Sequence, residues 1–208
     1  MRPALARFAL LPVLALALGL TAGCDRGAEG PAFHTTNVTG QMPDLKLGMP
    51  DAGGEVRRAA DFRDRVVLLY TGYTHCPDVC PMTLGRIKQV MGKLGKQADE
   101  VAVLFVTVDP ERDTPEVMRR YTANFDMPQL TGIMGEGKAF AQFKKRFHIY
   151  VQKEKEGPED EDYLVNHSSQ VFVFDPQGEA RLIARLSGKN PDPVEQVAQD
   201  VRKLLEGK

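Results

Sequence analysis

The sequence predicts an α/β domain in which helices flank a central mixed sheet. Short apolar runs at residues 66–70 and 101–108 alternate with segments in which apolar residues recur every three or four positions. This alternation is typical of parallel strands connected by helices. Two further strand-like runs, at 170–174 and 181–186, flank the turn sequence Asp-Pro-Gln-Gly, which predicts an antiparallel hairpin beside the parallel strands.

The first half of the domain begins with a glycine turn at 53–54, which we interpret as a hairpin. The run 66–70 is the expected first core strand, because charged residues precede it and Thr-Gly follows it. After Pro81 the apolar spacing becomes helical, and Gly95 is a suitable stop. The inward face of this helix is expected to carry Leu84, Ile87, Val90, Met91 and Leu94. A second buried strand follows at 101–108.

Thr114 and Pro115 open the next helix, because a capping hydroxyl followed by proline at the first position is a typical helix start. A short strand is expected at 130–134, and a helix at 138–147, where phenylalanines recur on one face. The charged segment 153–162 is expected to be an exposed loop.

The closing helix is predicted for residues 193–205, with valines and leucines on its inward face. The element order is therefore strand, helix, strand, helix, short strand, helix, hairpin, helix. This order is the plan of a thioredoxin-like domain. In that plan, the loop that follows the first core strand and opens a helix holds the reactive cysteines.

The N-terminal residues 1–23 resemble a bacterial lipoprotein signal peptide. A basic start is followed by an apolar run at 8–20, which is too short to span a bilayer unaided. Small residues precede Cys24, which we therefore expect to become the lipidated first residue of the mature chain. An ordinary secretory signal cut nearby and an uncleaved anchor are the alternatives. Residues 24–40 are then a tether without periodicity, and residues 41–208 are the folded domain.

All three alternatives imply export and retention at or near a membrane. Asp25, directly after the cysteine, resembles an inner-membrane retention signal. We therefore expect the protein to be lipid-anchored at the periplasmic face of the bacterial inner membrane. The net charge of −1 gives no reason to expect nucleic acid as a partner.

Cys76 and Cys80 are the other two cysteines, in the run Gly-Tyr-Thr-His-Cys-Pro-Asp-Val-Cys-Pro at 72–81. Two thiols at this spacing can bind one metal ion or each other, and thiolates favour copper(I), zinc or disulfide chemistry. A disulfide between them would close a very small loop and add little stability, so a structural disulfide is the poorest explanation. Their place at the start of a helix favours the thiolate.

A metal site would need a third ligand, and the chain has four histidines. His34 lies in the expected tether, His75 should point away from the thiols, and His148 follows a helical face. His167 lies just before the C-terminal hairpin, a position that faces the cysteine loop in a thioredoxin-like fold. The predicted fold therefore favours His167 as the third ligand.

Three motifs, in this order along the chain, resemble the Sco/SenC family. They are the cysteine run at 72–81, the sequence Val-Asp-Pro-Glu-Arg-Asp-Thr-Pro at 108–115, and His167-Ser168 with Asp175-Pro176 beyond it. The resemblance covers about residues 40–206, and its cysteine motif is highly specific. Members of this family are membrane-tethered, thioredoxin-like copper proteins that serve the assembly of cytochrome c oxidase.

The resemblance implies that Cys76, Cys80 and His167 are copper ligands. Two thiolates suit copper(I), and the imidazole extends tolerance to copper(II). The family usually has aspartate where this chain has Asn166, so that charge is missing as a partner for the imidazole. Asp109 is a candidate contact of the site or of a partner, although Asp-Pro after a strand is also ordinary turn chemistry.

The leading hypothesis is a copper chaperone, a carrier rather than an enzyme, that delivers copper to the binuclear copper centre of cytochrome c oxidase. Its expected partners are the copper-site subunit of the oxidase, an upstream copper donor, and the membrane through the lipid on Cys24. The alternative is a thiol–disulfide oxidoreductase that uses Cys76 and Cys80 to reduce the cysteines of the oxidase copper site. A peroxidase or redox sensor is a third class, but the sequence shows no peroxidatic motif beyond the paired cysteines. The methionines are dispersed along the chain and are expected to fill the core.

Overall fold

The computed structural model describes residues 32–155, 157, 162–187 and 193–207. The expected signal peptide, Cys24 and the first part of the expected tether, up to residue 31, therefore lie outside the described residues. Within the described part of the chain, no helix has the length and apolar character needed to cross a membrane. The compact unit begins at Phe33.

Ten strands and four helices form this unit in the part of the chain that the structure describes. The strands are β1 (Thr36–Asn37), β2 (Met49–Pro50), β3 (Val56–Arg57), β4 (Val66–Gly72), β5 (Val101–Thr107), β6 (Leu130–Ile133), β7 (Val151–Glu154), β8 (Leu164–His167), β9 (Val171–Phe174) and β10 (Ala180–Ala184). The helices are α1 (Val79–Leu94), α2 (Pro115–Ala123), α3 (Gly137–Arg146) and α4 (Pro193–Glu206), with short 3-10 turns at Ala59–Phe62 and Gly95–Glu100.

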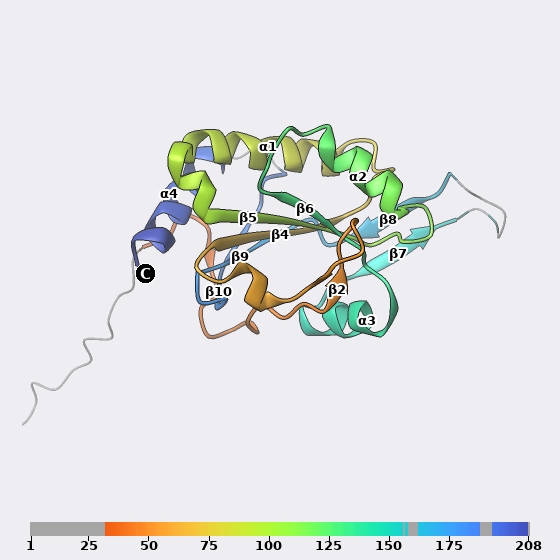
Figure 1. Cartoon of the computed structure of the whole chain (residues 1–208), viewed down its shortest axis with the longest axis horizontal. Coiled ribbons are helices and arrows are strands. Elements are labelled where there is room, and N and C mark those ends of the chain that lie inside the picture. The colour runs from red at the N-terminus through yellow and green to blue at the C-terminus, as the bar shows by residue number, and fades with distance from the viewer. Residues whose placement is uncertain (1–31, 156, 158–161, 188–192, 208) are drawn as a thin grey trace, which may run out of the picture. The chain divides into compact units, whose positions relative to one another are not determined.

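The main sheet has six strands in the order β1-β10-β9-β4-β5-β6. Strands β4, β5 and β6 run parallel, whereas β9 and β10 form an antiparallel hairpin against β4. Helices α1, α2 and α4 cover one face of this sheet, and α3 covers the other (Figure 1). The predicted α/β class, with a thioredoxin-like mixed sheet between helices, is confirmed.

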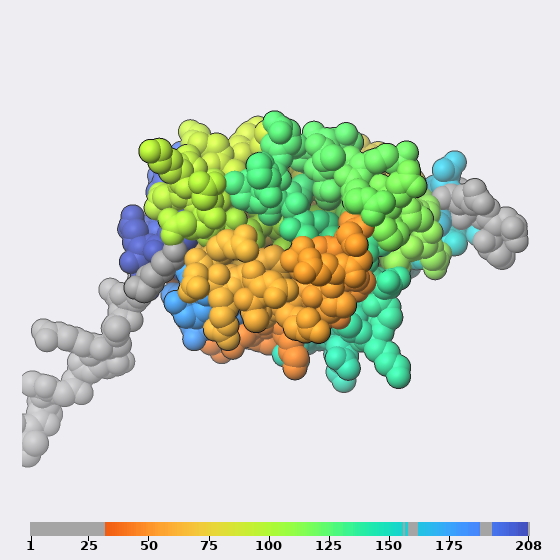
Figure 2. All heavy atoms as spheres, viewed as in Figure 1, coloured from red at the N-terminus to blue at the C-terminus, as the bar shows by residue number. Residues whose placement is uncertain are grey.

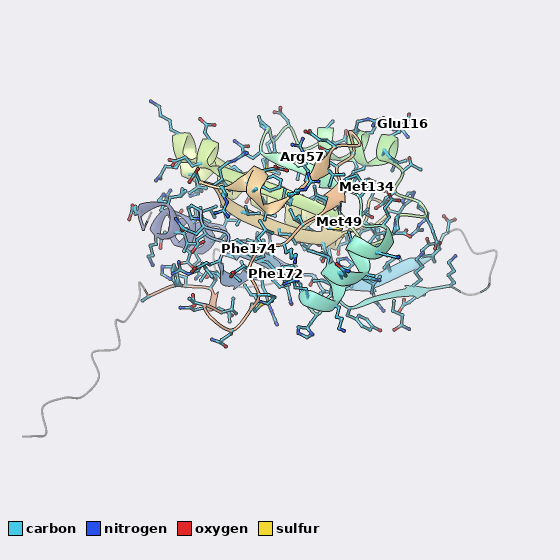
Figure 3. All side chains as sticks on the ribbon, turned by 60° about the horizontal axis from the view of Figure 1, so that its bottom comes forward. Met49, Arg57, Glu116, Met134, Phe172 and Phe174 are labelled. Carbon is cyan, nitrogen blue, oxygen red and sulfur yellow. The ribbon has the colours of Figure 1, made fainter. Side chains whose placement is uncertain are left out.

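Aromatic side chains fill the layer between the sheet and α3. The Phe147 ring centroid lies 5.7 Å from that of Phe172 and 5.8 Å from that of Phe174, both on β9 (Figure 3). Phe143, one turn earlier in α3, lies 5.0 Å from Phe147. The predicted phenylalanine face of α3 is therefore what joins this helix to the sheet.

The segment before β4 wraps around the sheet and covers one face of the molecule (orange in Figure 2). Its β2–β3 hairpin, predicted from the glycine turn, also extends the sheet at β6. Asp51 bridges Ile133, and the backbone N–H of Met134 donates to the carbonyl of Pro50. Met49 and Met134 are buried beside these contacts (Figure 3), as expected for core-filling methionines.

The domain begins earlier than expected, at Phe33 rather than at residue 41. Strand β1 pairs with β10, and the carboxylate of the fully buried Asp200 on α4 accepts hydrogen bonds from the backbone N–H groups of His34 and Thr35. These partners lie far away in the sequence, so no local pattern marks the segment as part of the fold.

The charged segment 153–162 is expected from the sequence to be an exposed loop, but in the structure it begins as a strand. Its first residues, Lys153 and Glu154, belong to β7, which pairs with β8 in a two-stranded antiparallel sheet where Val151 lies opposite His167. The side chains of β7 alternate between partly and fully exposed, so the strand has no buried apolar face. Without such a face, its sequence is not distinguishable from that of an exposed loop.

Helix α1 begins at Val79, slightly before the expected start at Pro81. Proline is tolerated in the first turn of a helix, because the N–H groups there have no intrahelical acceptor. Cys80 is therefore a helical residue in spite of the proline that follows it. The helix ends at Gly95 as predicted, with φ of 59° at this residue.

Candidate metal centre

Cys76 lies just before α1 and caps the start of the helix with its sulfur. Asp78 occupies the N-cap position but its side chain makes no capping hydrogen bond. Instead, the backbone N–H of Cys80 donates to Cys76 Sγ over 3.4 Å. The positive end of the helix dipole favours negative charge at such a position. Cys76 is partly exposed, so this sulfur is accessible from solvent.

Cys80 is the inner thiol of the pair and is fully buried. The hydroxyl of Tyr70, on β4, donates a hydrogen bond to Cys80 Sγ over 3.5 Å. Gly72 leaves room for the sulfur, because a Cβ at that position would lie 2.9 Å from Cys80 Sγ. Strand β4 therefore packs directly against the Cys80 side chain.

The two cysteines differ in acidity although both are free thiols. A hydrogen bond from Cys80 lowers the pKa of Cys76 to about 5, with help from the backbone N–H groups of Asp78 and Cys80 and against the effect of partial burial. Cys80 donates this hydrogen bond to Cys76 and is buried, and both effects raise the pKa of Cys80. At neutral pH the pair is therefore a partly exposed thiolate beside a buried thiol.

His167 ends strand β8 and presents Nε2 to the buried thiol. Its Nδ1 lies 2.9 Å from the carbonyl oxygen of Ser168, which also accepts a hydrogen bond from the hydroxyl of Thr71 over 3.1 Å. A carbonyl can only accept, so Nδ1 carries the proton and Nε2 carries the lone pair. Nε2 lies 3.5 Å from Cys80 Sγ.

Two tyrosine rings hold the imidazole in place. The Tyr73 ring lies edge-on to it, with centroids 5.9 Å apart and an interplanar angle of 88°. The Tyr70 ring lies 6.3 Å away on another side. This burial lowers the pKa of His167, so the imidazole is neutral at pH 7 and able to bind a metal.

The donor set fits a soft metal ion. Metal–sulfur and metal–nitrogen bonds of about 2.3 and 2.1 Å at a tetrahedral angle put the two donors about 3.6 Å apart. The observed separation of Cys80 Sγ and His167 Nε2 is 3.5 Å. Nevertheless, no three His, Cys, Asp or Glu side chains among the described residues are already gathered around one metal position. A metal bound by all three groups would therefore require a rearrangement of Cys76, Cys80 or His167.

Asp109 is placed beside the site rather than in it. Its buried carboxylate accepts hydrogen bonds from Tyr163 and Arg112, each over 2.6 Å. Burial acts to raise the pKa of Asp109, but these two hydrogen bonds overcome it and hold the pKa below its ordinary value. The guanidinium of Arg112 also lies 3.6 Å from the Tyr163 ring and 5.7 Å from the Tyr73 ring. Asp109 thus fastens the β7–β8 hairpin, which carries His167.

Asp113, in the loop between β5 and α2, anchors the cysteine loop. This buried carboxylate accepts hydrogen bonds from the backbone N–H of Thr74 over 3.1 Å and from the Thr74 hydroxyl over 2.6 Å. The hydroxyl of Thr107 on β5 donates to it as well. His75 Nδ1 lies 3.5 Å from the same carboxylate. His75 Nδ1 therefore contacts Asp113 and Thr74 rather than the sulfur atoms.

Asn166 does not take part in orienting the imidazole. Its amide donates to the carboxylate of Glu154 on β7, on the exposed side of the hairpin. Adjacent residues of a strand point to opposite faces, so the side chain at this position is directed away from that of His167. The absence of an aspartate here therefore leaves the surroundings of Nε2 unchanged.

A family model described as SCO1/SenC matches residues 48–206 of this chain. The chain belongs to the Sco/SenC family. It is 39% identical over 159 residues to the protein SCO2 homolog, mitochondrial, of Homo sapiens, which covers 74% of this chain and 57% of the relative. The corresponding Bos taurus protein is 43% identical over 132 residues, covering 62% of this chain and 48% of the relative. The chain thus spans about half the length of these curated relatives.

Solved structures of Sco proteins share the fold. Bradyrhizobium japonicum ScoI with copper bound superposes with a TM-score of 0.66 at 32% identity, covering 77% of this chain and 98% of that chain. Apo Sco1 from Thermus thermophilus gives a TM-score of 0.65 at 34% identity, covering 83% of this chain and 97% of that chain. This Sco-family domain therefore has solved relatives that span nearly its whole folded part.

Proposed function

We propose that this Sco-family domain is a copper carrier that holds copper on Cys76, Cys80 and His167. The observation that carries the proposal is the 3.5 Å approach of His167 Nε2 to Cys80 Sγ, next to a Cys76 thiolate. The copper-bound states of the Bradyrhizobium and Arabidopsis ScoI proteins support it. We further propose that the copper is delivered to the binuclear copper centre of cytochrome c oxidase during assembly. BsSco, which shares the fold, is described as a member of a family of cytochrome c oxidase assembly proteins.

The burial of the three groups suggests an order of exchange. Cys76 and His167 are both partly exposed, whereas Cys80 is fully buried. An incoming donor or acceptor would therefore meet Cys76 or His167 before Cys80. Three protein ligands leave one coordination position open, which permits handover from ligand to ligand without release of a free ion. The oxidase copper-site subunit and an upstream donor are the partners of this exchange.

The same proposal includes export and a lipid on Cys24, which would hold the carrier at the periplasmic face of the inner membrane. The lipoprotein-like signal at residues 1–23 supports this placement. Metabolic labelling with a fatty acid analogue should mark the wild-type protein and not the Cys24→Ala variant.

Copper titration of the folded domain tests the carrier function. The wild-type domain should bind one copper per chain, Cys76→Ser and Cys80→Ser should lose it, and His167→Ala should bind copper(II) at least tenfold more weakly. His34→Ala is the matched control, because this exposed histidine is held through its backbone. Equal copper(II) affinity in the His167→Ala and His34→Ala variants would remove His167 from the ligand set.

Thiol–disulfide exchange is the second candidate function, and one observation favours it. A partly exposed thiolate next to a buried thiol is also the arrangement of an attacking and a resolving cysteine. In this case a Cys80→Ser variant should trap a mixed disulfide through Cys76. Activity in oxidase assembly that survives His167→Ala but not either cysteine variant would favour thiol exchange over copper delivery.

A further inference from the structure

Tyr70 is a fully buried tyrosine that contacts two of the three site residues. Its hydroxyl donates to Cys80 Sγ over 3.5 Å, and its ring lies 6.3 Å from that of His167. The other side of the ring stacks on Phe105, with centroids 6.0 Å apart. Neither the cysteine motif nor the periodicity of β4 distinguishes this residue from an ordinary core aromatic.

The polar atom of Tyr70 needs an explanation, because the residue is fully buried. Burying a hydroxyl costs free energy unless it makes a hydrogen bond. Phenylalanine would fill the same space without that cost. The partner that the structure provides for the hydroxyl is the sulfur of Cys80. The phenol is therefore suited to act on this sulfur rather than only to fill the core.

We propose that Tyr70 weakens the electron-donor strength of the Cys80 sulfur and so stabilises the reduced form of the site. A hydrogen bond to a ligand sulfur withdraws electron density from it, and such bonds tune the potential of copper–thiolate sites. Copper(II) depends on thiolate donation more than copper(I) does. With copper bound, Tyr70 therefore favours copper(I); this part of the inference rests on the proposed function.

Without metal, the same hydrogen bond acts on the thiol–disulfide balance. The Cys76–Cys80 disulfide and two molecules of glutathione give the dithiol and one glutathione disulfide, with two electrons and two protons transferred. The sulfur of a thiol or thiolate accepts a hydrogen bond better than the sulfur of a disulfide. Tyr70 thus stabilises the dithiol side of this reaction, whether or not copper is the cargo.

The chain offers a matched control in Tyr121. The Tyr121 ring also stacks on Phe105, with centroids 5.5 Å apart. Its hydroxyl oxygen is buried but has no hydrogen-bond partner among the residues that the structure describes. Tyr121→Phe therefore removes a buried phenol oxygen from the same aromatic layer without removing a sulfur contact.

The deciding experiment is the equilibrium of the metal-free domain with glutathione buffers of graded redox ratio. Tyr70→Phe should shift this equilibrium about fivefold toward the disulfide, as expected for one net hydrogen bond. Tyr121→Phe should leave it unchanged. A shift of less than twofold in Tyr70→Phe, or an equal shift in Tyr121→Phe, would overturn the proposal.

A second experiment, with copper added, distinguishes failure of this inference from failure of the proposed function. If the wild-type domain binds copper, Tyr70→Phe should raise the affinity for copper(II) relative to copper(I) about fivefold, measured as the midpoint of the bound ion. An unchanged midpoint would contradict the effect on copper. If neither protein binds copper, the carrier proposal fails, and the glutathione equilibrium still decides the role of Tyr70. Near-UV circular dichroism of each variant confirms that the aromatic layer is intact.

Discussion

Gly72 makes room for the buried thiol by having no side chain. A Cβ at this position would lie 2.9 Å from Cys80 Sγ and 2.7 Å from the Cε2 atom of Phe105. Both neighbours are fully buried and β4 is buried along its whole length, so neither can move aside freely. The close approach of strand and sulfur therefore depends on glycine.

Replacing Gly72 by alanine should destabilise the domain by about 1–3 kcal/mol, because the added methyl group overpacks the core. Urea unfolding would measure this change. Gly85→Ala is the control: Gly85 lies inside α1, and a Cβ there would meet nothing within 4 Å. This substitution should stabilise the domain by about 0.4–1 kcal/mol. Equal effects of the two substitutions would show that the space at Cys80 is not restricted.

Cys76 should remain reactive in weakly acidic solution. Its pKa is about 5, so the thiolate is present above that pH and is lost only as the pH falls through it. An ordinary cysteine, with a pKa of about 8.5, would already be mostly protonated at pH 7. The rate of alkylation by iodoacetamide in the metal-free Cys80→Ala and wild-type domains measures this. The wild-type profile should have its midpoint near pH 5, and Cys80→Ala should move it upward by removing the main hydrogen bond to the thiolate.

The β7–β8 hairpin is the element that brings His167 to the cysteines. Two hydrogen bonds hold this hairpin. Asp109 accepts one from the Tyr163 hydroxyl, and the Tyr73 hydroxyl accepts one from the backbone N–H of Val165 over 3.3 Å. Among the described residues, β7 and β8 pair only with each other and not with a strand of the main sheet. These side-chain contacts therefore fix the position of the hairpin against the main sheet. Asp109 therefore acts on the site through the placement of this hairpin.

Tyr163→Phe should loosen the hairpin without changing any of the proposed ligands. It removes a hydrogen bond to a buried carboxylate, which is worth about 1.5–3 kcal/mol. Hydrogen exchange of the β8 amides should become faster, and copper(II) should bind several-fold more weakly. Tyr121→Phe serves as the control, because the Tyr121 hydroxyl has no hydrogen-bond partner among the described residues. Faster exchange in both variants would mean that Asp109 is not the anchor.

The elements that the sequence predicted are those with a buried face. The helices and the central strands repeat apolar residues at a period that burial imposes, whereas β7 alternates between partly and fully exposed side chains and gives no such signal. The site follows the same rule. Cys76, Cys80 and His167 carry recognisable chemistry, but Tyr70 and Thr71 read as ordinary core residues of β4. Their partners, Cys80 and Ser168, meet them only after the chain has folded.

At the scale of the whole molecule, the start of the domain is fastened to its end. The Asp200 carboxylate accepts hydrogen bonds from the backbone of His34 and Thr35 over 2.8–3.0 Å and from the Thr35 hydroxyl over 2.9 Å. The Lys203 ammonium lies 3.7 Å from the same carboxylate. One buried side chain of α4 thus holds the segment that leads into β1.

Asp200→Asn should release this segment while the rest of the domain stays folded. The amide keeps one acceptor oxygen but places an NH₂ group where a second acceptor is needed, so one or more donors lose their partner. Hydrogen exchange of the His34 and Thr35 amides should become at least tenfold faster. Glu206→Gln, an exposed carboxylate near the end of the same helix, is the control. Unchanged exchange in Asp200→Asn would mean that β1 pairing alone holds the segment.

The position of β1 has a practical consequence for any shortened form of the protein. β1 shields the outer side of β10, where Val38 N–H also donates to the carbonyl of Arg181. A chain cut to start at residue 41 would lack this cover, and the unsatisfied peptide groups of β10 would be open to a strand from another copy. Self-association of such a fragment would then report the truncation rather than a property of the intact molecule. Fragments intended for solution work should therefore retain Phe33 and everything after it.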